Sequence, residues 1–212
     1  MLTSKRLLEL TKYIESNDFV ADIGADHGKF IIEIANKYKN QCYLAVENKE
    51  GPFSNLKKSV EKYNFNKNIE CSLSDGIDYL PNYVNTLVFS GMGGYNVIEI
   101  LSKNIEKLKY IKKIVFSVHK NSIQLEQFLK FKGFIPCGYS FVKEGGILYT
   151  FICVKYDNTL SFDNFNKLNE RICPKTDAII IQKTNKDVAN TKLKFLKKYL
   201  RSCTVEGCLN EN

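Results

Sequence analysis

Residues Val20 to Gly28 read V-A-D-I-G-A-D-H-G, an apolar run followed by a turn that contains two glycines. The apolar residues from Phe19 to Ile23 suit a buried parallel strand. Gly24 and Gly28 allow the backbone to approach a ligand closely, because neither carries a Cβ atom. The next residues, 29–39, repeat apolar side chains at helical spacing. A strand, a glycine turn and a helix in this order predict the ligand crevice of an open α/β sheet.

The alternation of strands and helices continues to about residue 155, which predicts an α/β fold with one mostly parallel, Rossmann-like sheet. The expected strands are 19–24, 42–47, 69–73, 87–90 and 114–118, followed by an antiparallel hairpin of 135–142 and 147–154. Helices are expected after Ser4, Gly28, Pro52 and Gly94, and one more ends near Gly133. We expect one domain over residues 1–156 and a short helical C-terminal appendage over residues 157–212.

The composition describes a globular chain with a basic surface. Of the 212 residues, 44% are apolar and 25% charged, and the net charge is +8. No apolar stretch approaches the ~20 residues of a membrane helix, and no signal peptide is recognisable, so we expect a cytoplasmic protein without membrane contact. The basic clusters are Lys57, Lys58 and Lys62, then Lys107, Lys109, Lys112 and Lys113, and the tail from Leu193. They favour an anionic partner such as nucleic acid, and the alternative is an ordinary solvated lysine surface.

The seven cysteines are odd in number and lack the CxxC spacing of zinc or redox sites, so we expect free thiols and no metal. Cys42, Cys71 and Cys153 lie in predicted strands, where a reduced thiol behaves as a small hydrophobic side chain. Cys203 and Cys208, near the C-terminus, stay open as ligands of some group.

Acidic residues and glycines follow the predicted strands at their carboxyl ends, where open sheets bind ligands. They are Asp22, Gly24, Asp26 and His27 after the first strand, Glu47 after the second, Asp75 and Gly76 after the third, and Gly91 to Gly94 after the fourth. Glu47 follows the glycine turn by about 20 residues, the spacing of an acid that accepts the ribose hydroxyls of a nucleoside cofactor. Asp75 is placed to accept from an adenine amino group.

The glycine spacing distinguishes between two cofactors. A dinucleotide site needs G-x-G-x-x-G, whereas this chain has Gly24-x-x-x-Gly28. Asp22 and Asp26 bracket the turn and would repel a pyrophosphate. The same two carboxylates would attract a ligand that carries an amine and a sulfonium. The charges therefore favour S-adenosylmethionine over NAD.

These segments resemble the bacterial tRNA (adenine-22, N1)-methyltransferase family. The resemblance rests on A-D-I-G-A-D-H-G at 21–28, E-N-K-E-G-P-F at 47–53, S-D-G-I-D-Y-L at 74–80, S-G-M-G-G at 90–94 and V-K-E-G-G-I-L-Y at 142–149. It spans roughly residues 5 to 155. The resemblance implies a class I methyltransferase core, S-adenosylmethionine as cofactor and tRNA as partner, with methylation at N1 of adenosine 22. We expect a monomer.

The resemblance also implies roles for single residues. Asp22, Gly24 and Gly28 fall on the methionine side of the cofactor, Glu47 on its ribose, Asp75 and Gly76 on its adenine, and Gly91 begins the loop beside it. Met92, Gly93, Gly94, Tyr95 and His119 fall on the side of the target base. Asp26 is the expected catalytic residue, and His27 orients it. The family tends to have Gln-Pro-Asn where this chain has Ser117-Val118-His119.

Structural alternatives remain open for several of these residues. Asp26 could cap the helix that follows it. His27 and His119 could have structural roles, and Tyr95 could pack at a helix start. At the level of function, the alternatives are a methyltransferase that acts on another RNA or a protein, and a non-catalytic RNA-binding module. An NAD oxidoreductase is the third and is disfavoured by the glycine spacing.

Overall fold

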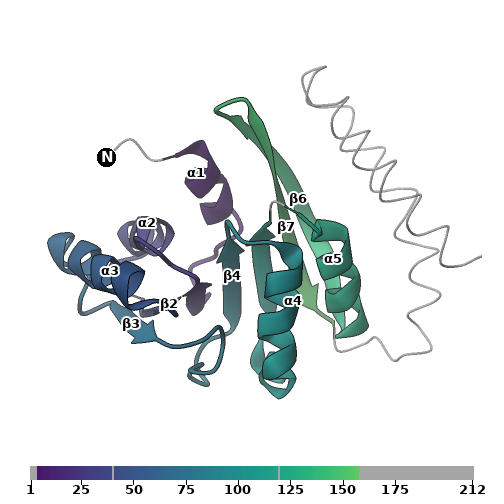
Figure 1. Ribbon diagram of the computed structural model, residues 1–212, viewed down its shortest axis with the longest axis horizontal. Helices are drawn as coiled ribbons and strands as arrows, with labels where there is room; N and C mark the ends of the chain where they lie inside the picture. Colours follow the sequence, from purple (N-terminus) through teal and green to yellow (C-terminus); the bar gives the residue numbers. More distant parts are fainter. Residues whose placement is uncertain (1–3, 40, 119, 158–212) are drawn as a thin grey trace, which may run out of the picture. The chain divides into compact units, whose positions relative to one another are not determined.

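The computed structural model describes residues 4–39, 41–118 and 120–157, and these form one seven-stranded sheet covered by helices (Figure 1). The strands are β1 (Val20–Ile23), β2 (Tyr43–Glu47), β3 (Ile69–Leu73), β4 (Thr86–Ser90), β5 (Lys113–Ser117), β6 (Phe134–Glu144) and β7 (Ile147–Tyr156). The helices are α1 (Lys5–Thr11), α2 (Lys29–Lys37), α3 (Glu50–Lys62), α4 (Gly94–Lys103), the 3₁₀ helix η1 (Ile105–Tyr110) and α5 (Ser122–Phe131). No helix in these described stretches is long and apolar enough to cross a membrane.

The strand order is β3-β2-β1-β4-β5-β7-β6. Strands β1 to β5 are parallel, whereas β7 runs antiparallel to both β5 and β6. The register pairs Ile23 of β1 with Val46 of β2 and with Phe89 of β4. The carboxyl ends of β1, β2 and β4 therefore lie side by side, and the loops that follow these strands are neighbours.

Side chains alternate between the two faces of the sheet and so build two apolar layers. Ala21 and Ile23 of β1 belong to the cluster that includes residues of α4 and α5. Val20 belongs to the other cluster, together with residues of α1, α2 and α3. Helices thus cover both faces, and the central strands are buried on both sides, as expected for parallel strands that read as continuous apolar runs.

The predicted fold class is confirmed, and most element boundaries agree within a few residues. The hairpin strands are longer than predicted, and they are joined at Gly145 and Gly146, whose φ values of +57° and +80° suit a two-residue turn with positive φ at both positions. Ser4 caps α1 as expected, since its side chain accepts from the Arg6 backbone N–H. The predicted appendage over 157–212 lies outside the described residues except for its first residue.

Two expectations about single residues are wrong. Cys42 is exposed and precedes β2, because the strand begins at Tyr43, whose buried ring anchors that end of the ladder. Lys113 belongs to a cluster that the sequence assigned to an exposed basic surface, yet it is buried. Lys107, from the same cluster, donates to the backbone oxygen of Ile77 at 2.9 Å. Two lysines of this cluster therefore make contacts within the fold.

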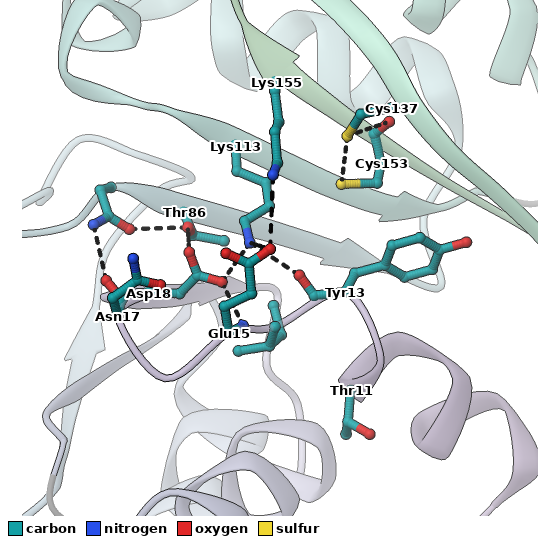
Figure 2. A network of polar contacts seen from close by, with 12 residues as sticks. Thr11, Tyr13, Glu15, Asn17, Asp18, Thr86, Lys113, Cys137, Cys153 and Lys155 are labelled. Atoms are coloured by element: carbon teal, nitrogen blue, oxygen red, sulfur yellow. Dashed lines mark hydrogen bonds and ion pairs between the residues drawn. The ribbon is translucent and has the colours of Figure 1, made fainter.

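Lys113 lies in a polar network at the amino ends of the strands (Figure 2). Its ammonium group pairs with the Asp18 carboxylate and donates to the Tyr13 backbone oxygen at 3.0 Å. The other Asp18 oxygen lies 3.1 Å from the Thr86 hydroxyl, and the Glu15 backbone N–H donates to Asp18 at 2.7 Å. The network joins the residues before β1 to the first residues of β4 and β5, at the edge opposite the glycine turns.

Candidate functional site

Glu47 connects the end of β2 to the turn after β1. Its side chain is 7% exposed, and its carboxylate accepts the backbone N–H groups of Asp26 at 3.1 Å, Asn48 at 3.0 Å and Lys49 at 3.2 Å. An ionised carboxylate offers about four acceptor positions, so these three bonds leave capacity for a ligand hydroxyl. Glu47 thus has a structural role that the sequence did not reveal, in addition to its predicted role as ribose acceptor.

The turn after β1 is fixed by the neighbouring strand and by the loop after β4. The N–H groups of Gly24 and Ala25 both donate to the Val46 backbone oxygen at 2.9 Å. Gly24 has a φ of +77°, and a Cβ atom there would lie 2.8 Å from Cε of Met92. Met92, which we expected on the target-base side, therefore also packs against the predicted cofactor loop.

Gly28 serves helix packing as well as the turn. It is the N-cap of α2 with a φ of +68°, and a Cβ atom there would lie 2.6 Å from Cδ1 of Leu56 in α3. The alternative in which Asp26 caps this helix is wrong, because Gly28 occupies the cap position. Asp26 has a φ of +50° and an exposed side chain, and its Oδ1 lies 3.7 Å from Nε2 of His27. The two side chains lie near each other and both are exposed, and their catalytic role stays a prediction.

Asp22 is the buried acid of the site. Its side chain is 3% exposed, and burial, followed by the charge of the neighbouring Glu47, raises its pKa to about 7. A buried carboxylate beside a second carboxylate is costly unless a positive charge offsets it. The position therefore fits a ligand with an ammonium or sulfonium group, which is the chemistry expected on the methionine side of S-adenosylmethionine.

This pKa predicts a pH-dependent affinity for a cationic cofactor. Protonation of Asp22 removes the negative charge that the ligand needs, so the affinity falls as the pH drops through about 7. Between about pH 8 and pH 6 we expect the affinity of the wild type for S-adenosylmethionine to fall by about tenfold more than the affinity of Asp22→Asn. Titration calorimetry of both proteins with S-adenosylmethionine at the two pH values measures these affinities. Equal pH dependence in the two proteins would contradict the assignment.

Asp75, after β3, is paired across the site with α4. Lys103 Nζ lies 2.8 Å from its Oδ2, and the Asn48 amide lies 3.5 Å from its Oδ1. The hydrogen bond from Lys103 holds the pKa of Asp75 below its usual range, so the carboxylate is a charged acceptor. Gly76 lets Ile100 of α4 approach, since a Cβ atom there would lie 2.4 Å from Cγ2 of Ile100. The sequence did not single out Lys103, which lies 28 residues from Asp75 and belongs to no motif, and it gave no role to Asn48, which lies 27 residues away in the 47–53 segment.

The glycines after β4 differ in their surroundings. A Cβ atom at Gly91 or Gly93 would meet nothing within 4 Å, so these positions border open space. At Gly94 it would lie 2.2 Å from the Asn121 backbone oxygen, and the Gly94 N–H donates to the Lys120 backbone oxygen at 2.8 Å. Gly94 therefore packs against the loop after β5.

Two more residues were predicted on the target-base side, Tyr95 and His119. Tyr95 follows in the first turn of α4 with 58% of its surface exposed. His119 lies outside the described residues. In the described stretches, no three His, Cys, Asp or Glu side chains are grouped so that they could hold a metal ion.

Comparisons with known proteins agree with this geometry. A methyltransferase domain family model matches residues 3–152. The tRNA (adenine(22)-N(1))-methyltransferase of Bacillus subtilis (strain 168) is 22% identical over 196 residues, which cover 89% of this chain and 82% of that protein.

Two solved structures share the fold. Streptococcus pneumoniae Sp1610 in complex with S-adenosyl-L-methionine is 22% identical, with a TM-score of 0.71, over 94% of this chain and 100% of that chain. M. capricolum TrmK in complex with S-adenosyl-homocysteine is 20% identical, with a TM-score of 0.67, over 97% and 99% of the two chains. The predicted cofactor and its demethylated product are thus the ligands of these related structures. Because the family model covers well over half of the 212 residues, the chain belongs to the methyltransferase domain family, with the sheet of its class I, S-adenosylmethionine-dependent members.

Proposed function

We propose that this chain transfers a methyl group from S-adenosylmethionine to N1 of adenosine 22 in tRNA. The observation that carries the proposal is the buried carboxylate of Asp22 beside Glu47 at the carboxyl edge of β1 and β2, where a cationic nucleoside fits. The similarity to the Bacillus subtilis enzyme supports the choice of tRNA and of the methylated atom.

The cofactor would lie along the edge of the sheet. Asp22 faces its cationic methionine end, Glu47 accepts its ribose hydroxyls and Asp75 accepts its adenine amino group. When bound, S-adenosylmethionine supplies a methyl group on a positively charged sulfur. The open positions at Gly91 and Gly93 leave room for a base beside it. This arrangement makes positioning the main task of the protein.

The chemistry requires little acid-base catalysis. Adenine N1 has a lone pair in the plane of the ring and attacks the methyl carbon in line with the breaking bond. The methylated base becomes cationic, and the exposed carboxylate of Asp26 can stabilise this charge or accept a proton from N6. Because N1 belongs to the Watson–Crick edge, the target base must leave its pair and its stack before it reaches the site.

The substrate surface has the charge that RNA requires. Lys57, Lys58 and Lys62 of α3 are all exposed, as the sequence predicted for this cluster. They lie in the second half of α3, the helix that follows Glu47, and they are proposed to contact phosphates of a bound RNA. The third predicted cluster, in the tail, lies outside the described residues. We expect the enzyme to act in the cytoplasm.

Tyr95 is proposed to stack on the extruded adenine. Stacking of a base on an aromatic side chain contributes about 1–3 kcal/mol. Tyr95→Ala should therefore lower kcat/KM for tRNA about 10- to 100-fold. Tyr95→Phe should keep kcat/KM close to that of the wild type, and both variants should bind the cofactor as the wild type does. The matched control is Tyr110→Ala, which removes another half-exposed tyrosine at the end of η1. If both alanine variants have the same activity, Tyr95 does not stack on the substrate.

Asp26 is proposed to act in methyl transfer rather than in cofactor binding. Asp26→Asn tests this, because asparagine tolerates the positive φ of this position. We expect a fall in kcat of about tenfold from the lost charge, with the affinity for S-adenosylmethionine within about twofold of wild type. Single-turnover assays and calorimetry separate the two effects. A large loss of affinity with unchanged kcat would move Asp26 to the cofactor.

The class of substrate can be tested with methyl-labelled S-adenosylmethionine and unmodified bulk tRNA. We expect label that nuclease digestion releases, and no label on protein when tRNA is omitted. Label that stays on protein after nuclease treatment would identify a protein methyltransferase. Binding of both cofactor and tRNA without transfer would identify a non-catalytic RNA-binding module.

A further inference from the structure

Two cysteine sulfurs lie side by side on the β6–β7 hairpin, on the side of the sheet that α1 covers. Sγ of Cys137 is 3.2 Å from Sγ of Cys153 and 3.4 Å from the Cys153 backbone oxygen (Figure 2). Cys153 pairs with Gly138 in the ladder, and the register shifts between Pro136 and Gly138. Cys137 is therefore the extra residue of a β-bulge, a device that redirects a side chain out of the regular alternation.

The two thiols differ in their access to solvent. Cys137 is exposed, whereas Cys153 is 3% exposed and belongs to the apolar cluster beneath α1. A small oxidant in solution therefore reaches Cys137 first. Cys153 is shielded from the oxidant but lies in contact with the sulfur that reacts.

The charged surroundings favour a thiolate at Cys137. Its hydrogen bond with Cys153 lowers the pKa of Cys137, and the nearby Lys155 and Lys113 ammonium groups lower it further, against the opposing effects of partial burial and of Glu15. The same hydrogen bond and burial raise the pKa of Cys153, which stays a thiol. Tyr13 also lies beside the pair, and burial raises its pKa to about 12, so it remains neutral. A thiolate is the form of cysteine that reacts with peroxides.

We propose that Cys137 and Cys153 are a peroxide-reactive pair that forms a reversible disulfide across the hairpin. The Cys137 thiolate attacks one oxygen of hydrogen peroxide, the O–O bond breaks, and the hydroxide released takes up a proton to become water. Cys137 is left as a sulfenic acid. The Cys153 sulfur then attacks the Cys137 sulfur, the S–O bond breaks, and the hydroxyl group leaves with the thiol proton as a second water. One peroxide is reduced and two thiols are oxidised.

The geometry requires only a small movement. A disulfide has an S–S length of about 2.05 Å, so the two sulfurs, now 3.2 Å apart, must approach by about 1.1 Å. Cys137 is the exposed member of the pair, so the proposal assigns this movement to its side chain. Strands β4 and β5 lie between this pair and Asp22 in the sheet, so neither thiol is part of the proposed cofactor site.

Peptide mapping under non-reducing conditions tests the proposal. The full-length protein is reduced, freed of reductant, exposed to one molar equivalent of hydrogen peroxide and then alkylated. We expect a cross-linked peptide pair that joins Cys137 to Cys153 within one chain, and its loss on treatment with dithiothreitol. Cys42 is the internal reference, because it is also exposed, and it should stay alkylatable.

Two variants assign the order of events. In Cys153→Ser, the sulfenic acid at Cys137 has no resolving thiol and should be trapped by dimedone, whereas in Cys137→Ser, Cys153 should remain reduced. Cys42→Ser, the matched control, should form the cross-link like the wild type. The proposal is overturned if Cys137 in the wild type stays as reduced as Cys42, or if it becomes linked to a different cysteine or to a second chain. The wild-type map decides the question even if a variant does not fold.

Discussion

Replacing Glu47 by glutamine is expected to weaken the binding of S-adenosylmethionine about 100-fold. The variant removes the charged acceptor for the ribose hydroxyls, and hydrogen bonds to a charged group contribute about 1.5–3 kcal/mol. It also turns an amide N–H₂ group toward backbone N–H groups that now donate to the carboxylate, those of Asp26, Asn48 and Lys49. The turn after β1 would lose part of its attachment to β2. Titration calorimetry gives the change in Kd.

Glu50→Gln is the matched control for this experiment. Glu50 is an exposed carboxylate in the first turn of α3, three residues further along the chain. Its replacement removes the same charge near the same edge without touching the glycine turn. We expect a Kd within about twofold of wild type. A Kd for Glu47→Gln that also stays within this range would remove Glu47 from the cofactor site.

Replacing Asp18 by alanine is expected to lower the free energy of unfolding by about 3–5 kcal/mol. The variant removes the closest carboxylate from the buried Lys113 ammonium, and breaking a buried ion pair in this way destabilises a fold by this amount. The side chains of Lys113 and Asp18 are 4% and 8% exposed. The loss also removes the acceptor of the Glu15 N–H and one of the two acceptors of the Thr86 hydroxyl, which keeps Asn85. Chemical denaturation measures the change.

Two further variants isolate the cause. Glu15 lies 3.6 Å from both Lys113 and Lys155, but its side chain is 58% exposed, so Glu15→Ala should cost no more than about 1 kcal/mol. The double variant with Asp18→Ala and Lys113→Met should recover much of the loss, because it removes both charges. If Asp18→Ala is as stable as Glu15→Ala, the buried pair does not hold the strands together.

The sheet could be predicted because its information is local. Short strand-like runs, followed after β1, β2 and β4 by a glycine or an acid and then by helical periodicity, indicate parallel strands whose carboxyl ends lie on the same side. The hairpin followed from two adjacent glycines, whose positive φ values the turn requires. These signals depend only on residues that are close to each element in the sequence.

The network in Figure 2 could not be predicted, because it depends on partners far apart in the sequence. Asp18 and Lys113 are 95 residues apart, and nothing near either residue indicates a buried ion pair. Lys113 therefore reads in the sequence as one of several surface lysines. Lys113 is buried because it is the first residue of β5, which pairs with β4 within the sheet.

The loops that form the candidate site could be predicted from the sequence, but the role of each glycine in them could not. A glycine that permits ligand approach and a glycine that permits close packing look alike in sequence. In the structure, Gly28 and Gly94 face Leu56 and the Asn121 backbone, whereas Gly91 and Gly93 border open space. In the same way, Lys103 pairs with Asp75 because α4 packs against the loop that follows β3, a contact that the sequence does not indicate.

Methylation of two tRNA transcripts tests the central claim most directly. One unmodified transcript carries adenosine at position 22 and the other guanosine, and each is incubated with the full chain and methyl-labelled S-adenosylmethionine. We expect label in the first transcript alone, recovered as 1-methyladenosine at position 22. Label in both transcripts, or in neither while the cofactor binds, would contradict it.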